Sequence, residues 1–240
     1  MKVEDHILRD VQEHAEEVFP QECCGLIVEA AGKLSIVRSR NIAPDPYRTF
    51  MVDPVLFLEH KDRTKAVYHS HPRRSAKPSN ADKASCASVN LPFLILSWPS
   101  GELSRLMPGP YEAELEGRQF VYGVFDCLAI VEDYYSREYG ITLPNYGRPP
   151  FGWWAEGVDY ISQRYSKMKF VDVQDPAPGD VIVMQMGGAK VPNHVGVYLE
   201  GGILLHHALH MLSRKDVYKG YWRKYTVRIL RHENNRHPSR

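Results

Sequence analysis

The sequence predicts a mixed α/β unit followed by an α+β unit, and three observations lead to this fold class. Over residues 1–108, helical and strand-like apolar patterns alternate. A short segment rich in proline and glycine follows, and beyond it one helical pattern leads into a series of strand-like runs. The length of 240 residues agrees with two small units, because at roughly 150 residues per domain it corresponds to about 1.6 domains.

The composition is that of a folded globular protein. Hydrophobic residues make up 43% of the chain and charged residues 25%, proportions that exclude a disordered or collagen-like chain. The net charge of +1 gives no reason to expect a nucleic-acid partner. The longest nearly apolar run, residues 91–98, is far shorter than the roughly 20 residues that span a bilayer, and the first ten residues carry several charges. We therefore expect neither a membrane span nor a signal peptide.

The elements of the first unit follow from local patterns. Apolar residues spaced three to four apart predict a helix over residues 4–18, which Pro20 ends. Short branched apolar runs on either side of Gly32 predict a β-hairpin. The hairpin strands cover residues 24–29 and 34–37, and the further predicted elements are a helix over 54–62, a strand over 66–71, a helix over 80–89 with Ser79 as its N-cap, and strands over 93–98 and 103–106.

The boundary between the units is expected near Pro108 to Pro110, where helix and strand breakers gather and no apolar period is visible. We therefore divide the chain into domains of residues 1–108 and 109–240. The second domain is expected to contain a helix over 125–139, a loop over 142–153, another short helix, and strands over 180–186, 194–199, 203–209 and 225–230.

Two histidines and a carboxylate have the spacing of a metal site. His69 and His71 lie on a predicted strand, where residues i and i+2 project from the same face, and Asp82 follows in the pattern H-x-H-x₇-S-x₂-D. Three nitrogen or oxygen ligands leave a fourth tetrahedral position open for water, which is the arrangement of a catalytic zinc site. Glu22, directly before the first predicted strand, is a candidate base that stays off the metal.

The whole string resembles the JAMM (MPN+) metallopeptidase motif, and the similarity covers residues 1–108. The matching positions are a glutamate within Pro-Gln-Glu-Cys-Cys-Gly-Leu-Ile, the H-x-H pair, a serine and an aspartate: Glu22, His69, His71, Ser79 and Asp82. The resemblance implies a zinc ion (Zn²⁺) bound by both histidines and the aspartate, with Glu22 as general base and Ser79 donating to the carbonyl oxygen that becomes an oxyanion. It also implies hydrolysis of an amide or isopeptide bond. The alternative is a pseudo-enzyme that keeps only the shape.

A cysteine and two histidines form a second candidate site. Cys127 opens a predicted helix, where the helix dipole and free backbone N–H groups stabilise a thiolate. His194 begins one predicted strand, and His206 lies in the next. If residues 200–202 form the turn between these strands, the two histidines fall close together, so that one can pair with the thiol while the other orients it. On a strand His207 points to the opposite face, so we prefer His206.

These residues, with Pro-Gly-Asp before one strand and Asn-His-Val-Gly-Val-Tyr at the next, resemble the NlpC-type cysteine peptidases over residues 112–231. The resemblance implies a papain-like α+β fold with Cys127 as nucleophile, His194 as general base and acid, and His206 as orienter. It also implies cleavage of the stem peptides of bacterial peptidoglycan, typically between γ-D-glutamyl and a diamino acid.

Some residues near this site depart from the family pattern or have a second interpretation. Leu128 and Ala129 replace the usual Ser-Gly after the cysteine, and either Phe120 or Tyr122 stands for a tyrosine that usually precedes it. The pair Trp153-Trp154 is either a sugar-stacking platform or an anchor for its loop, and we favour the anchor.

The remaining cysteines suit reduced thiols in a cytosol, because two are adjacent and none forms a C-x-x-C pair. Cys24 and Cys86 lie within apolar segments, so we expect them, with Cys23, to be packed in the core.

The two units in this order resemble the tail-assembly proteins of lambda-like long-tailed phages, which belong to the tail tip. The resemblance implies a bifunctional peptidase that is made in the host cytoplasm, carried at the virion tail tip and active at the periplasm or cell wall. Its implied partners are tail-tip proteins and peptidoglycan stem peptides. Two alternatives stay open. One is a structural tail-assembly factor with vestigial sites, and the other is an isopeptidase acting on ubiquitin-like proteins, which leaves Cys127, His194 and His206 without a task.

Overall fold

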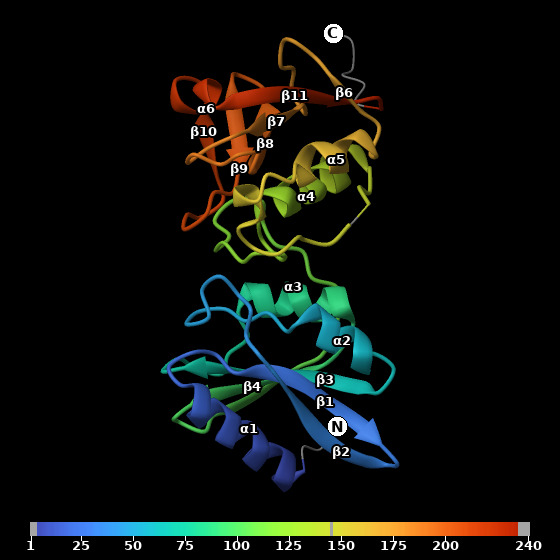
Figure 1. Cartoon of the computed structure of the whole chain (residues 1–240), viewed down its shortest axis with the longest axis vertical. Coiled ribbons are helices and arrows are strands. Elements are labelled where there is room, and N and C mark those ends of the chain that lie inside the picture. Colours follow the sequence, from blue (N-terminus) through green and yellow to red (C-terminus); the bar gives the residue numbers. More distant parts are fainter. Residues whose placement is uncertain (1–3, 145, 235–240) are drawn as a thin grey trace. The chain divides into compact units, whose positions relative to one another are not determined.

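The computed structural model describes residues 4–144 and 146–234 of the chain (Figure 1). The chain divides into two compact units, Met1–Ala113 and Glu114–Arg240, each with its own sheet and core. Within the described ranges, every helix is too short or too polar to span a bilayer.

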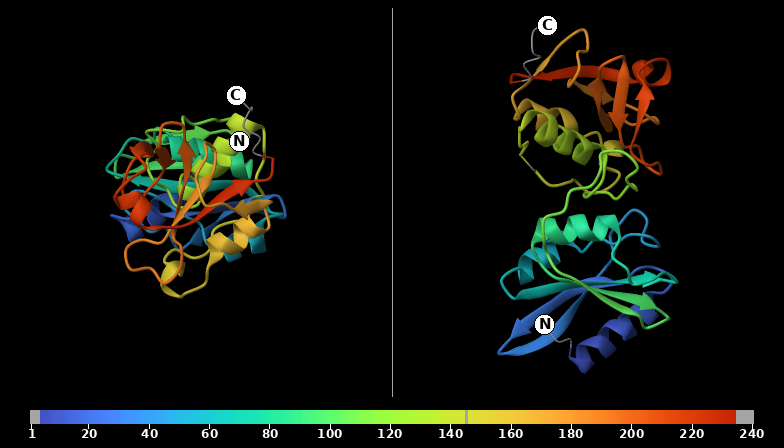
Figure 2. Two further views of the ribbon diagram at one scale, coloured as in Figure 1. Left: turned by 90° about the horizontal axis from the view of Figure 1, so that it is seen from above. Right: turned by 180° about the vertical axis from the view of Figure 1, so that it is seen from behind.

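The first unit is a five-stranded sheet with helices on both faces. The strand order is β2-β1-β3-β4-β5, in which β3 and β4 are parallel and the other neighbours antiparallel. The elements are α1 (Asp5–Val18), β1 (Cys24–Ala30), β2 (Lys33–Ser39), α2 (Pro54–His60), β3 (Thr64–Pro72), α3 (Asn80–Val89), β4 (Phe93–Trp98) and β5 (Leu103–Leu106). In both views of the ribbon, α1 covers one face of this sheet while α2 and α3 cover the other (Figures 1 and 2).

Alternation along β3 assigns its side chains to the two faces. Tyr68 packs with the apolar stripe of α1, whereas its neighbour Val67 packs with Cys86 of α3. Each predicted element of this unit is present, and the helix expected over 54–62 ends at His60. The predicted α/β class of this unit is therefore confirmed.

The second unit is a six-stranded antiparallel sheet with α4 packed on one face. The strand order is β10-β9-β8-β7-β11-β6. The elements are α4 (Cys127–Tyr139), the 3-10 turn η1 (Trp153–Ala155), α5 (Tyr160–Ser166), β6 (Phe170–Asp172), β7 (Val181–Met184), β8 (His194–Leu199), β9 (Ile203–His206), β10 (Arg214–Val217), α6 (Tyr221–Lys224) and β11 (Thr226–His232). The core between α4 and the sheet contains Ile130, Tyr135, Val195 and Leu205.

The predicted α+β class of this unit is also confirmed, with four short elements that the sequence did not predict. These are η1, β6, β10 and α6. The sequence of β10, Arg-Lys-Asp-Val, has no apolar alternation, and three of its four residues are exposed. It is a strand because the edge of β9 offers it backbone partners, from Arg214 opposite His206 to Val217 opposite Ile203. The predicted strand over 203–209 is shorter than expected and ends at His206.

Candidate metal centre and cysteine–histidine site

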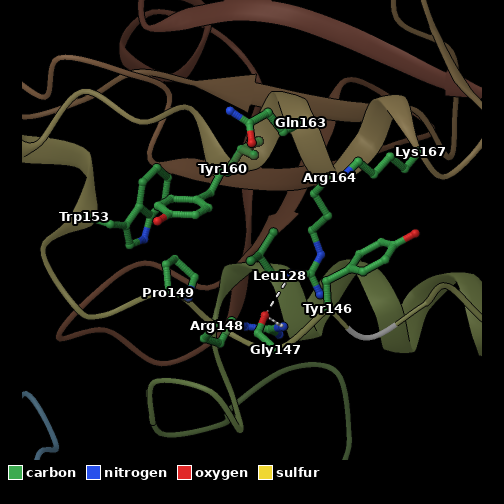
Figure 3. Close-up of a pocket in the computed structure, with 11 residues that line it drawn as sticks. Leu128, Tyr146, Gly147, Arg148, Pro149, Trp153, Tyr160, Gln163, Arg164 and Lys167 are labelled. Atoms are coloured by element: carbon green, nitrogen blue, oxygen red, sulfur yellow. Dashed lines mark hydrogen bonds between the residues drawn. The ribbon is translucent and has the colours of Figure 1, made fainter.

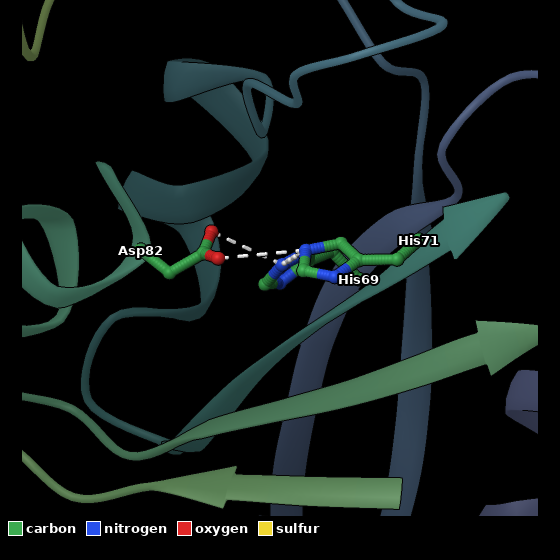
Figure 4. A group of neighbouring side chains, drawn as sticks. All are labelled: His69, His71 and Asp82. Carbon is green, nitrogen blue, oxygen red and sulfur yellow. Dashed lines mark hydrogen bonds and ion pairs between the residues drawn. The ribbon is translucent and has the colours of Figure 1, made fainter. Parts of the chain in front are cut away.

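His69, His71 and Asp82 converge in the first unit (Figure 4). His69 Nε2 lies 3.2 Å from His71 Nε2 and 3.2 Å from Asp82 Oδ1, and His71 Nε2 lies 3.4 Å from Asp82 Oδ2. All three residues are buried, and their ligand atoms lie within 4.8 Å of one another. Two imidazole nitrogens and one carboxylate form a donor set that zinc accepts.

Two local structures position these side chains. The histidines are two residues apart on β3, so both project toward the face that carries α3. Ser79 is the N-cap of α3: its hydroxyl accepts a hydrogen bond from Asp82 N at 3.1 Å, and Asp82 Oδ2 accepts one from Ser79 N at 2.7 Å. This capping box directs the Asp82 carboxylate toward the histidines.

The surroundings of the histidines fit a divalent metal. His71 Nδ1 lies 2.8 Å from the carbonyl oxygen of Ser75 and donates to it, which directs Nε2 of the same ring toward His69 and Asp82. Phe50 stacks on the ring of His69 with a centroid distance of 4.1 Å and excludes water from it. Two Nε2 atoms and a carboxylate therefore face one point in a largely dry environment.

Charge and burial set the protonation of the carboxylates. Burial alone would raise the pKa of Asp82, but His69 and the hydrogen bonds from His69, His71 and Ser79 hold that pKa well below its usual range. Burial raises the pKa of Glu22, and His69 and Arg74 oppose that shift. Arg74 Nη2 donates a hydrogen bond to Glu22 Oε1, a contact that the sequence did not suggest. Glu22 is thus near the histidines but engaged by an arginine.

In the second unit Cys127 is the first residue of α4 and is half-buried. Asp126 caps the helix by accepting hydrogen bonds from Leu128 N at 3.0 Å and Ala129 N at 2.8 Å. Burial, then the charge of Asp126, raises the pKa of Cys127 to about 12, while the backbone N–H of Val195 favours the thiolate. The thiol is therefore protonated at rest.

His194, His206 and Asp216 form a hydrogen-bonded chain on the sheet. His194 Nε2 lies 3.1 Å from His206 Nδ1, and His206 Nε2 lies 3.1 Å from Asp216 Oδ2. Burial, with a contribution from the other two histidines nearby, lowers the pKa of His194 to about 3. Both imidazoles project toward Trp222, the ring of which lies 4.3 Å from that of His206.

Gly196 allows this pairing of histidines. It lies opposite His206 in the register of β8 and β9, and a Cβ atom at Gly196 would lie 2.9 Å from His206 Cβ and 2.8 Å from Leu204 Cδ1. Such contacts are too short for real side chains, so only glycine leaves the ring of His206 free to reach His194.

The structure therefore unites His194 with His206 and adds Asp216, but it does not join them to the thiol. In the part of the chain that the structure describes, no hydrogen bond connects Cys127 to either histidine. The link is indirect, because the N–H of Val195, the neighbour of His194, influences the thiol. The sequence did not predict Asp216 as a site residue, because β10 has no alternating apolar pattern that would mark it as a strand.

His207 occupies the other face of the sheet, as expected. It is fully buried beside Phe120, with a ring centroid distance of 5.2 Å, and neither ring nitrogen has a hydrogen-bond partner among the described residues. Trp153 is buried, which agrees with the loop anchor rather than the sugar platform. Three cysteines, Cys23, Cys24 and Cys86, are free and buried, as the sequence predicted.

Comparison with known proteins gives the relationship of both units. A model of prokaryotic homologs of the JAB domain matches residues 4–107, and a model of the NlpC/P60 family matches residues 117–231. Tail tip assembly protein K of Escherichia phage N15 is 34% identical over 231 residues, which cover 94% of this chain and 94% of that protein. This chain belongs to the tail tip assembly protein K family. The predicted JAMM-like and NlpC-type units, and the resemblance to tail-assembly proteins of lambda-like phages, are thus confirmed.

Further relatives are more distant. Tail tip assembly protein K of Escherichia phage lambda is 31% identical over 169 residues, which cover 70% of this chain and 81% of that protein. Among solved structures, the solution structure of protein DSY2949 from Desulfitobacterium hafniense aligns with 45% of this chain and 91% of that chain at 22% identity and a TM-score of 0.35. The JAB1/MPN domain protein AF2198 from Archaeoglobus fulgidus aligns with 45% of this chain and 87% of that chain at 19% identity and a TM-score of 0.28.

We expect the stability of the folded chain to fall below pH 6.5, and the change His207→Phe to weaken that fall. Burial lowers the pKa of His207 from 6.5 to about 4 in the folded protein. Between these pH values the unfolded chain binds a proton that the folded chain does not, which costs about 1.4 kcal/mol per pH unit. Urea unfolding across this pH range measures the effect. His210→Phe, at an exposed histidine nearby, is the control, and an unchanged pH slope in His207→Phe would contradict the prediction.

Proposed function

We propose that this chain is a phage tail tip assembly component with two peptidase sites. The cysteine–histidine site hydrolyses peptide bonds in peptidoglycan stem peptides, and the metal centre hydrolyses amide or isopeptide bonds. The observation that carries the proposal is the buried convergence of His69, His71 and Asp82 with Glu22 nearby, since the burial of several ionisable groups together is costly unless they pair with one another or bind an ion. The assembly role rests on the name of the relatives in phages N15 and lambda.

We assign the two activities to residues 1–108 and 109–240. The family matches over residues 4–107 and 117–231 lie within these ranges and support the assignment. The chain is made in the host cytoplasm, joins other tail tip proteins and acts at the periplasm or cell wall from the virion tail tip. Peptidoglycan stem peptides are the substrate of the second domain.

In the metal centre, His69, His71 and Asp82 would hold a zinc ion, which when bound supplies Lewis-acid activation of water and of the scissile carbonyl. The buried Glu22 accepts the proton of the attacking water and passes it to the leaving amine. The Ser79 hydroxyl accepts its hydrogen bond from Asp82 N, so its own hydrogen remains available for the carbonyl oxygen of the substrate. Arg74 has to release Glu22 before the carboxylate can act as a base.

In the second domain, His194 takes the proton of the Cys127 thiol and the sulfur attacks the carbonyl carbon of the scissile peptide bond. His194 then gives this proton to the leaving amine, and water hydrolyses the thioester with His194 as base. His206 and Asp216 orient the imidazole through their two 3.1 Å contacts. Because the resting thiol and imidazole are both neutral, we place the proton transfer in the substrate complex.

A second candidate function is structural, and two contacts favour it. Arg74 engages the candidate base Glu22, and the Cys127 thiol makes no described hydrogen bond to a histidine. Both features suit a factor that keeps the folds of two peptidases and uses them to bind other tail proteins.

Metal binding is the first test. We expect zinc to copurify with the wild-type protein and with Glu22→Gln, whereas His69→Ala loses it, because a two-ligand site binds zinc far more weakly than a three-ligand site. Elemental analysis measures the metal content, and circular dichroism checks that each variant is folded. Absence of zinc from wild type purified without chelator, or full retention in His69→Ala, would count against the metal centre.

Digestion of purified peptidoglycan tests the cysteine site. We expect the wild-type protein to release stem-peptide fragments, detected by mass spectrometry, and Cys127→Ala to lose at least about a hundredfold in rate because the nucleophile is absent. Cys86→Ala removes a buried thiol of the first unit and serves as the control with activity retained. Equal digestion by wild type and Cys127→Ala, or none by either, would refute the peptidase proposal for this site.

Complementation separates enzyme from assembly factor. We expect a phage that carries Cys127→Ala together with Glu22→Gln to be defective in infection, because both proposed reactions need these side chains. Plaque counts measure infection, and electron microscopy measures the yield of complete tails. Full infectivity of the double variant would favour the structural function.

A further inference from the structure

A pocket lies beside the first turn of α4, the helix that begins at Cys127 (Figure 3). Its volume is about 250 Å³, and Leu128, the neighbour of Cys127, forms part of its wall. Trp153 and Tyr160 line one side of it and Tyr146 the other, and three cationic side chains also line it: Arg148, Arg164 and Lys167. No step of the proposed reaction uses these groups.

Arg148 has a structural role, because each N–H group of its guanidinium already donates to another residue of the protein. It donates to both oxygens of Asp126 at 2.8 and 3.0 Å and to both oxygens of Glu132 at 3.4 and 3.3 Å, with a further contact to the carbonyl of Gly147. A guanidinium group has five N–H bonds, so all of them are taken. Through these ion pairs, Arg148 also offsets part of the negative charge of Asp126 and Glu132 beside the pocket.

Arg164 and Lys167 keep donors for a ligand. Arg164 is only 7% exposed and is held by Glu132 at 2.9 Å and by the carbonyl of Gly147 at 2.9 Å, which occupy two of its five N–H bonds. Lys167 is exposed at the pocket and its ammonium group has no ion pair among the described residues. The fixed guanidinium and the flexible ammonium together give the pocket an excess of positive charge.

We propose that this pocket binds a carboxylate of the peptide substrate, with Arg164 and Lys167 as specificity-determining residues. A fixed guanidinium recognises a carboxylate with charge-assisted hydrogen bonds, and the apolar surfaces of Leu128 and Trp153 accept the adjoining methylene groups. Leu128, in the pocket wall, follows Cys127 in the first turn of α4, and on this basis we assign the carboxylate to a residue near the bond that is cleaved. This inference rests on the proposed peptidase function of Cys127.

Binding to the Cys127→Ala protein tests the pocket without hydrolysis. The probe is the tripeptide L-alanyl-γ-D-glutamyl-diaminopimelate, compared by isothermal titration calorimetry with copies amidated at one carboxylate at a time. We expect one amidation to weaken binding about tenfold, the loss of roughly one charge-assisted hydrogen bond. In the same background, Arg164→Gln and Lys167→Gln should lower affinity for the acid and remove its advantage over that amide.

Lys219→Gln is the matched control, because it removes an equal charge from an exposed lysine away from the pocket, and it should keep the tenfold preference. Thermal unfolding identifies a variant that fails to fold. If Arg164→Gln does not fold, Lys167→Gln, a change at an exposed position, still tests the pocket. Equal binding of acid and amides, or a preference that survives in folded Lys167→Gln, would overturn the pocket assignment. Carboxylate-selective binding without hydrolysis by the wild type would instead overturn only the peptidase function.

Discussion

The two-residue period of β-strands decides which polar side chains meet in this protein. On β3 it places His69 and His71 on the face that α3 covers, while Tyr68 between them packs against α1. On β8 and β9 it places His194 and His206 on one face and their neighbours in the core beneath α4. A slip of one residue in either sheet would exchange the polar and apolar faces and remove the site together with the core.

Helix N-termini supply the remaining groups of both candidate sites. Asp82 reaches the histidines because the capping box with Ser79 fixes its carboxylate, and Cys127 occupies the first turn of a helix that Asp126 caps. In the second unit, Arg148 binds this cap as a buried ion pair. Removing one partner of such a pair leaves an uncompensated charge that costs about 3–5 kcal/mol, so the loop that carries Arg148 is tied firmly to the start of α4.

Both sites adopt a resting form in which a proton or an ion pair has to rearrange before hydrolysis can begin. Glu22 is engaged by Arg74, and the thiol of Cys127 and the imidazole of His194 are neutral. Hydrogen bonds of catalytic groups often tighten only when substrate is bound. His194 and His206 lie on the face of the sheet opposite α4, so the proposed proton transfer also requires the His194 imidazole to reach the helix start that carries Cys127. The proposed carboxylate pocket has Leu128, the residue after Cys127, in its wall, so a peptide anchored there would bind beside the first turn of α4.

The sequence by itself determined the fold class of each unit, the hairpin, the helix capped by Ser79 and the pairing of His69 with His71, because all of these depend on residues close together in the chain. The tertiary structure alone decided the partners of these groups. Asp216 meets His206 through an edge strand without an apolar pattern, Arg74 reaches Glu22 across 52 residues, and Arg148 reaches Asp126 across 22. Local periodicity predicts the face of a strand or helix on which a side chain lies. It does not predict which charged residue from a distant part of the chain will contact that side chain, because this depends on how strands and loops pack.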